Sequence, residues 1–266
     1  MLKTRVLTAL ILLLIVLIIL LFTSIIVFEL FGLTLVAVAA WEWARLANLT
    51  TLKERLVYMI VVVVVCLIAW QIPPAWILTA AMIGWLCASC LVLCYPHASE
   101  FWGQNRWLKA SMGILVLTFF WIGLSVIRHY PRGIAHLLLA LCIIWAADTG
   151  AYFVGRRWGK HKLAPVVSPG KTWEGLLGGL VLSLLVAWIG GFWLGISPRY
   201  WLWGSLWVVL TVIASLFGDL FESMVKRQAG VKDSGKLLPG HGGLLDRIDS
   251  LTAGLPIFAL GLLLIS

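Results

Sequence analysis

Charged residues are scarce in this sequence. Asp, Glu, Lys and Arg together make up 12% of its 266 residues, whereas soluble domains have roughly 25%. There are only five cysteines, and no Ser- or Pro-rich linker separates one part of the chain from another. These absences exclude an ordinary soluble globular domain and a small disulfide scaffold. Three of the cysteines, Cys87, Cys90 and Cys94, lie in an apolar segment without a second pair, and we interpret them as small buried residues rather than metal ligands.

Apolar residues make up 62% of the chain, and they occur in runs that could cross a bilayer, which takes about 20 residues. We therefore expect an all-α fold, a polytopic integral-membrane helical bundle. We expect residues 1–266 to form a single integral-membrane domain, with N-terminal spans in about 1–133 and a C-terminal region in about 134–266 that would hold any catalytic residues. Nine spans are predicted, near residues 6–22, 25–44, 56–71, 75–94, 107–127, 134–154, 174–196, 200–221 and 248–265.

Basic residues are distributed unevenly between the predicted loops. If the N-terminus is cytoplasmic and the C-terminus outside, all 20 Lys and Arg residues except Arg128, Arg132 and Arg199 fall on the cytoplasmic side. The positive-inside rule favours this orientation. The net charge of +9 then reflects loops facing anionic lipid headgroups, and no nucleic-acid partner is needed to explain it.

The sequence SPGKTWEG at residues 168–175 resembles the end of a P-loop. However, Pro165 stands where a P-loop needs glycine, and a membrane helix follows, so the P-loop interpretation fails. Ser168 and Lys171 precede a helix N-terminus, where free N–H groups and the helix dipole favour anions. A capping turn with a snorkelling lysine is an equally good interpretation of this segment alone.

A second polar segment, residues 218–250, carries more chemistry. Asp219, Ser223 and Lys226 share one helix face, and Asp246 and Asp249 share a face at the start of the last span. Carboxylates from two helix ends could bind Mg²⁺, which uses one or two carboxylates together with substrate phosphates. The residues between them include Lys232, His241, Arg247 and four glycines, which could surround a nucleoside triphosphate.

Acidic residues also occur inside the predicted spans. Asp148 interrupts the sixth span, and an intramembrane carboxylate is a functional candidate unless it only bonds a neighbouring helix. Glu29 and Glu42 lie near span edges, and we interpret them as interfacial or packed against other helices.

The order of these residues resembles the signature of the phosphatidate cytidylyltransferase family. It runs as Ser223-x-x-Lys226-Arg227, then Lys232-Asp233-x-Gly235, then Pro239-x-His241-Gly242-Gly243-x-x-Asp246-Arg247-x-Asp249, and DTGAY at 148–152 with SPGKTWEG matches further family segments.

The resemblance implies that CTP and phosphatidic acid are converted to CDP-diacylglycerol and pyrophosphate with Mg²⁺ as cofactor. It also implies a multi-pass protein of the bacterial cytoplasmic (inner) membrane whose active site faces the cytoplasm. The catalytic residues would be Asp219, Lys226, Asp246 and Asp249, and the metal ligands Asp219 and Asp246, with Asp249 as a third ligand or a supporting residue. Substrate binding would fall to Asp148, Ser168, Lys171, Ser223, Arg227, Lys232, His241 and Arg247.

Alternatives to this activity are a CTP-dependent polyprenol or phytol kinase, which would release CDP, and a lipid transporter that would consume no CTP. The sequence leaves a homodimer open.

Overall fold

A computed structural model describes residues 2–97, 99–238 and 240–265, without the side chains of residues 2–7 and 9. The side chains of Lys3 and Arg5, which count toward the predicted orientation, therefore lie outside the described part of the chain. So does the whole of Pro239, which belongs to the signature.

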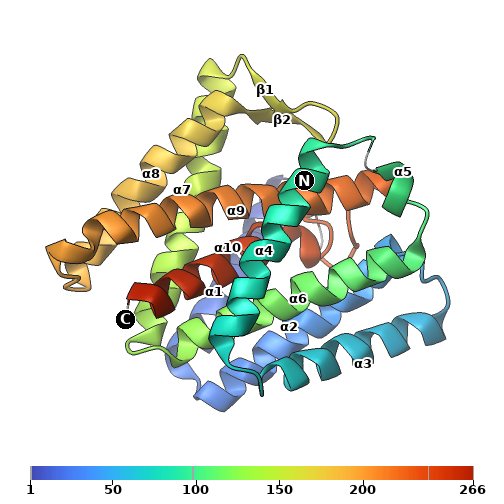
Figure 1. The fold of residues 1–266 in the computed structure, drawn as a ribbon, viewed down its shortest axis with the longest axis horizontal. Coiled ribbons are helices and arrows are strands. Elements are labelled where there is room, and N and C mark those ends of the chain that lie inside the picture. Colours follow the sequence, from blue (N-terminus) through green and yellow to red (C-terminus); the bar gives the residue numbers. More distant parts are fainter. Residues whose placement is uncertain (1, 98, 239, 266) are drawn as a thin grey trace.

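Helices form almost all of the secondary structure in the described residues, and each predicted span coincides with a long helix (Figure 1). The helices are α1 (Leu2–Phe22), α2 (Ile25–Leu46), α3 (Leu52–Ala69), α4 (Pro74–Leu93), α5 (Ser99–Trp102), α6 (Arg106–His129), α7 (Gly133–Trp158), α8 (Trp173–Trp193), α9 (Trp201–Gln228) and α10 (Leu245–Ile265), and a 3₁₀ turn covers Pro198–Tyr200.

Seven helices within the described residues are long and apolar enough to cross a membrane, namely α2, α4, α6, α7, α8, α9 and α10. The described apolar part of α1 is shorter, and α3 carries three charged residues, Lys53, Glu54 and Arg55, in its first turn. The chain is thus an all-α, multi-pass membrane protein. The count of nine spans and the direction of the termini stay predictions.

Polar side chains fix where several helices begin. Thr51 and Glu54 form a reciprocal capping box at the start of α3. Asn105 accepts hydrogen bonds from the backbone at the start of α6, and Thr172 accepts one from Gly175 at the start of α8. These caps satisfy N–H groups that have no partner within a first helical turn.

Two helix pairs form the C-terminal half of the bundle. Helices α7 and α8 run side by side, and α10 packs along α9 and also against α6 and α4 (Figure 1). Glycines allow the close approach of α7 and α8, because a Cβ atom at Gly150 would lie 2.6 Å from the carbonyl oxygen of Gly178. Helices α2 and α3 pack against α6, and α6 in turn packs against α10 and so connects them to this core.

A small hairpin joins α7 to α8 and was not predicted from the sequence. Strand β1 (Lys162–Ala164) pairs antiparallel with β2 (Ser168–Thr172), with Lys162 opposite Thr172. The hairpin stands at one end of the α7–α8 pair (Figure 1). Most of SPGKTWEG is therefore strand, followed directly by the first turn of α8.

The interpretation of Cys87, Cys90 and Cys94 as buried residues is wrong. All three are exposed free thiols, Cys87 and Cys90 on α4 and Cys94 directly after its last residue. Helix α4 buries its other face, through Leu78 and Trp85 among others. An apolar run that crosses a membrane does not reveal which of its faces meets the protein, because both faces are apolar.

Candidate active site

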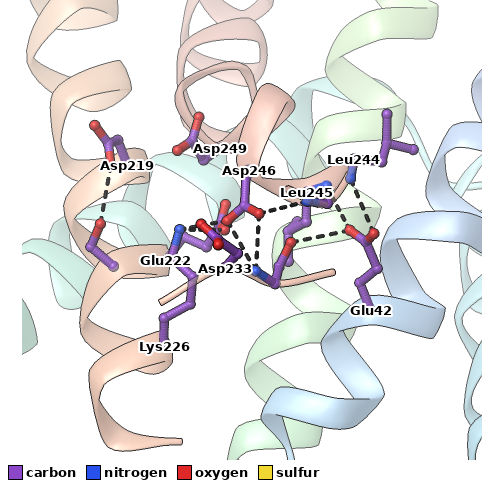
Figure 2. Close-up of polar contacts among 12 residues, drawn as sticks. Glu42, Asp219, Glu222, Lys226, Asp233, Leu244, Leu245, Asp246 and Asp249 are labelled. Carbon is purple, nitrogen blue, oxygen red and sulfur yellow. Dashed lines mark hydrogen bonds and ion pairs between the residues drawn. The ribbon is translucent and has the colours of Figure 1, made fainter. Parts of the chain in front are cut away.

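Lys226 of α9 lies at the centre of a buried group of charges. Its Nζ atom is 2.7 Å from Asp246 Oδ1 and 3.0 Å from Glu222 Oε1. Lys226 and Glu222 are 8% and 2% exposed. Removing one partner of a buried ion pair costs about 3–5 kcal/mol, so these three side chains depend on one another. They join α9 to the first turn of α10 (Figure 2).

Asp246 also holds the loop between α9 and α10, residues 229–244, which we call the glycine-rich loop. Its Oδ2 atom accepts a hydrogen bond from the backbone nitrogen of Gly243 at 2.8 Å and from that of Ser234 at 3.0 Å. These bonds satisfy N–H groups around the N-terminus of α10, where a carboxylate is also favoured by the helix dipole. Asp246 thus connects three elements: α9, the loop and α10 (Figure 2).

Glu42, near the end of α2, supports the same loop from the opposite side. Its carboxylate accepts hydrogen bonds from the backbone nitrogens of Leu244 and Leu245, at 3.1 and 2.8 Å, and from the Ser234 hydroxyl at 3.1 Å. Arg45, one turn later, donates to the carbonyl oxygen of Asp233 at 2.6 Å. The N-terminal half of the chain therefore shapes the candidate site.

Two glycines of the loop pack against Glu42 so closely that a side chain would not fit. A Cβ atom at Gly235 would collide with Glu42 Oε1, and one at Gly243 with Ser234 Oγ and Glu42 Oε2. Gly242 has a φ of +83°, which L-residues with side chains rarely adopt. The glycines therefore allow the loop backbone to pack directly against the carboxylates of Glu42 and Asp246.

The second polar segment joins this site through Lys171. Its Nζ atom lies 2.6 Å from Asp219 Oδ2, which ties β2 to α9. Ser223 donates a hydrogen bond to Asp219 Oδ1 at 3.2 Å, as their shared helix face predicts. The capping interpretation of SPGKTWEG is confirmed, since Thr172 caps α8. Lys171 pairs with a carboxylate of the acidic cluster, and the anion-binding interpretation stays a prediction.

Asp148 and Asp249 lie close to the Lys171–Asp219 pair. Asp148 is exposed on α7 and interacts electrostatically with Lys171 and Asp219. Within the described ranges it makes no hydrogen bond to another helix. Asp249 lies beside α9, and the close approach depends on Gly218. A Cβ atom at Gly218 would lie only 2.6 Å from the carbonyl oxygen of Asp249. One carboxylate oxygen of Asp249 accepts a hydrogen bond from the adjacent Ser250 backbone at 2.8 Å.

The donor set fits a hard cation in chemistry and charge. Four acidic side chains, Asp219, Glu222, Asp246 and Asp249, gather around two lysines. Glu222 Oε1 pairs with Lys226, and its Oε2 is buried without a hydrogen bond. Among the described residues, no three His, Cys, Asp or Glu side chains form a ready-made metal site. Carboxylate oxygens are nevertheless the ligands that Mg²⁺ prefers.

Other predicted site residues form no side-chain hydrogen bond or ion pair with this cluster in the described part of the chain. Arg227 and Lys232 are exposed, and neither forms an ion pair with the part of the chain that the structure describes. Ser168 begins β2, and His241 and Arg247 line an apolar groove on another face of α10. Their roles stay predictions.

Two residues that the sequence did not reveal as part of the site are Glu222 and Glu42. Glu222 stands one helical turn before Lys226, a spacing at which opposite charges pair. The interpretation that Glu42 packs against other elements is confirmed, but its partner, the glycine-rich loop, had no signal in the sequence.

These features define a class: a polytopic membrane protein with a lysine- and carboxylate-rich site at its helix ends, suited to phosphate chemistry. Comparison with known proteins identifies the family within this class. The sequence profile described as the cytidylyltransferase family matches residues 3–265. The chain belongs to this family.

Curated relatives match almost over their whole length. The chain is 44% identical to the phosphatidate cytidylyltransferase of Pseudomonas aeruginosa over 261 residues, covering 97% of this chain and 96% of the relative. It is 41% identical to that of Haemophilus influenzae, covering 97% and 98%. Identity to the Staphylococcus epidermidis protein of the same name is 37%, covering 96% and 97%. The family resemblance in the motifs is confirmed.

Proposed function

We propose that this protein is a membrane nucleotidyltransferase that converts CTP and phosphatidic acid to CDP-diacylglycerol and pyrophosphate in phospholipid synthesis. The single observation that carries the proposal is the 2.6 Å contact between Lys171 and Asp219. It brings SPGKTWEG, for which an anion site was one of two interpretations, to residues 218–250, whose lysines and carboxylates suit phosphate chemistry. The activity named for the relatives supports the same conclusion.

The reaction needs charge neutralisation more than a dedicated base. A phosphomonoester carries about −1.5 to −2 charge at pH 7, so an oxygen of the lipid phosphate can attack the α-phosphorus of CTP directly. The bond between the α-phosphorus and its bridging oxygen to the β-phosphorus breaks, and pyrophosphate leaves. The obstacle is to hold two anions together in line. Lys171 and Lys226 supply positive charge from the hairpin and from α9, and Lys232 and Arg247 would add to it.

Mg²⁺ is the proposed cofactor, held by the carboxylates of Asp219, Asp246 and Asp249. Asp249 has one hydrogen-bond partner, the Ser250 backbone, and Asp219 has two, Lys171 and Ser223. Asp246 has three, Lys226 and two backbone nitrogens, and is therefore the least free to bind a metal. When bound, Mg²⁺ would neutralise phosphate charge and help to align the reacting groups. In this proposal Asp246 contributes less to metal binding and mainly holds Lys226 and the glycine-rich loop in place.

The proposed location is the bacterial cytoplasmic membrane, with the site facing the cytoplasm, where CTP is made. The bacterial relatives and the concentration of Lys and Arg near the site support this orientation. The reaction as written uses residues of one chain only, and a homodimer stays a prediction.

The test is product analysis with purified protein, CTP labelled in the α-phosphate, phosphatidic acid and Mg²⁺. We expect the label in a CDP-lipid, with one pyrophosphate released for each lipid converted. The Asp219→Asn variant, prepared with the same detergent, gives the background. Release of CDP with a phosphorylated lipid would indicate a kinase, and no consumption of CTP would contradict both activities.

A further inference from the structure

An apolar groove of about 530 Å³ lies between α1, α2, α6, α7, α10 and the glycine-rich loop. Its lining is hydrocarbon and aromatic except at one end, where His241 and Arg247 stand. The volume is within the range of roughly 300–1,000 Å³ that is usual for small-molecule sites. The groove therefore has a long apolar body and one basic end.

Helix α10 carries this groove and the acidic cluster on different faces. Leu244, Arg247, Leu251 and Leu255 follow helical spacing along the groove. From Arg247 to Leu255 the helix rises about 12 Å, at 1.5 Å per residue. Asp246 lies on another face of the helix, toward Lys226. The basic end of the groove is thus at the same end of α10 as the candidate active site.

One face of helix α7 borders both the groove and the candidate active site. Leu137, Leu141 and Trp145 line the groove at four-residue intervals. Asp148 follows one turn later and interacts electrostatically with Lys171 and Asp219. The apolar body of the groove and the phosphate site are therefore consecutive parts of one helix surface.

We infer that the groove holds an acyl chain of the phosphatidate substrate, with the lipid phosphate at the end marked by Arg247 and His241. This inference rests on the proposed function. Arg247 is exposed at the groove end, and a guanidinium pairs well with a phosphate. His241 Nδ1 is buried without a hydrogen-bond partner in the described structure, so it is free to meet a polar headgroup atom. An apolar body next to a basic end matches the chemistry of an anionic lipid.

The first test fills the groove at Leu251, a half-buried position, with the variant Leu251→Trp. The control is Leu262→Trp, also half-buried on α10 but lining a different cavity. We expect Leu251→Trp to raise KM for dioleoyl phosphatidate about tenfold, while KM for dihexanoyl phosphatidate stays near the wild-type value. Leu262→Trp should leave both KM values unchanged. An equal change for both lipids, or no change for either, would overturn the inference.

The second test uses the unmodified protein and needs no turnover. A phosphatidate with a photoreactive diazirine in one acyl chain is irradiated with the protein in mixed micelles, and labelled peptides are mapped by mass spectrometry. Adducts are expected on the groove-lining parts of α7 and α10, and they should be suppressed by dioleoyl phosphatidate but not by dioleoyl phosphatidylcholine. Equal suppression by both lipids would mean that the groove holds bulk lipid. Absence of CDP-lipid formation by the wild type would contradict the proposed function separately.

Discussion

Glu42 Oε2 lies 2.8 Å from the backbone nitrogen of Leu245, although the two residues are 203 positions apart in the sequence. The contact joins α2, in the N-terminal half, to the first turn of α10, which carries Asp246. Since Glu42 also accepts hydrogen bonds from Leu244 and Ser234, it fixes two separate points of the glycine-rich loop that precedes α10. The N-terminal spans are therefore part of the structure that positions the chemistry.

Replacing this carboxylate should cost both stability and activity. In Glu42→Gln one acceptor oxygen becomes an NH₂ group that faces N–H donors, and each hydrogen bond to a charged group contributes about 1.5–3 kcal/mol. We expect a lower melting temperature and at least a tenfold loss of CDP-lipid formation at equal amounts of folded protein. Glu29→Gln, near the other end of α2, is the control and should keep its activity. Normal activity in Glu42→Gln would contradict the supporting role.

Because the glycine-rich loop is closely packed, a single methyl group added at Gly243 should strongly lower activity. A Cβ atom at Gly243 would collide with Ser234 Oγ and Glu42 Oε2, so Gly243→Ala should displace the loop and remove most activity. The matched control is Gly204→Ala in α9, where the added Cβ meets no atom within 4 Å. Thermal unfolding and turnover of the two variants, measured side by side, test this difference. Equal activities would show that the loop tolerates a side chain.

The sequence predicted the helices better than the contacts between them. Apolar runs sufficed to place the long helices. The motifs singled out both Lys171 and Asp219, but not the ion pair that joins them. The partner of Glu42 could not be predicted, because it depends on how α2 packs beside α10. The exposure of Cys90 was missed for a related reason, since a span that is apolar on all sides has no pattern that distinguishes its protein-facing side.

The Lys171–Asp219 pair should behave as one unit. Lys171→Ala removes a positive charge near the phosphates and leaves Asp219 without its cation, so turnover should fall by about tenfold or more while membrane insertion is kept. The double variant with Asp219→Asn should lose much less than the product of the two single losses. Lys162→Ala, on the paired strand and exposed, is the control. Full activity in Lys171→Ala would leave SPGKTWEG with only its capping role.

The predicted orientation can be tested with tags. A tag inserted after Arg157, beside the hairpin, and one within residues 228–238 should both be accessible only from the cytoplasm. A C-terminal tag should be accessible only from outside, because the positive-inside rule and nine spans place the two ends on opposite sides. Protease protection in sealed vesicles of both orientations gives the measurement. If either loop tag is found outside, the site would be separated from its supply of CTP.

The carboxylates of the site should differ in how their loss depends on Mg²⁺. Asp219 and Asp249 are proposed to face the metal, so Asp219→Asn and Asp249→Asn should raise the Mg²⁺ concentration needed for half-maximal activity. Both losses arise at one site, and the double variant should therefore be far from additive. Asp246 instead holds Lys226, Ser234 and Gly243. Asp246→Asn should mainly lower the melting temperature, and added Mg²⁺ should restore little of its activity.

Direct metal binding separates these roles without relying on turnover. Mn²⁺ in place of Mg²⁺ can be titrated by electron paramagnetic resonance into detergent-purified protein of matched monodispersity. We expect weaker Mn²⁺ binding in Asp219→Asn and Asp249→Asn than in Asp246→Asn, and wild-type binding in the control Glu100→Gln, an exposed residue of α5. If Asp246→Asn alone loses Mn²⁺, Asp246 is the principal ligand, and its contact with Lys226 must be replaced when the metal binds.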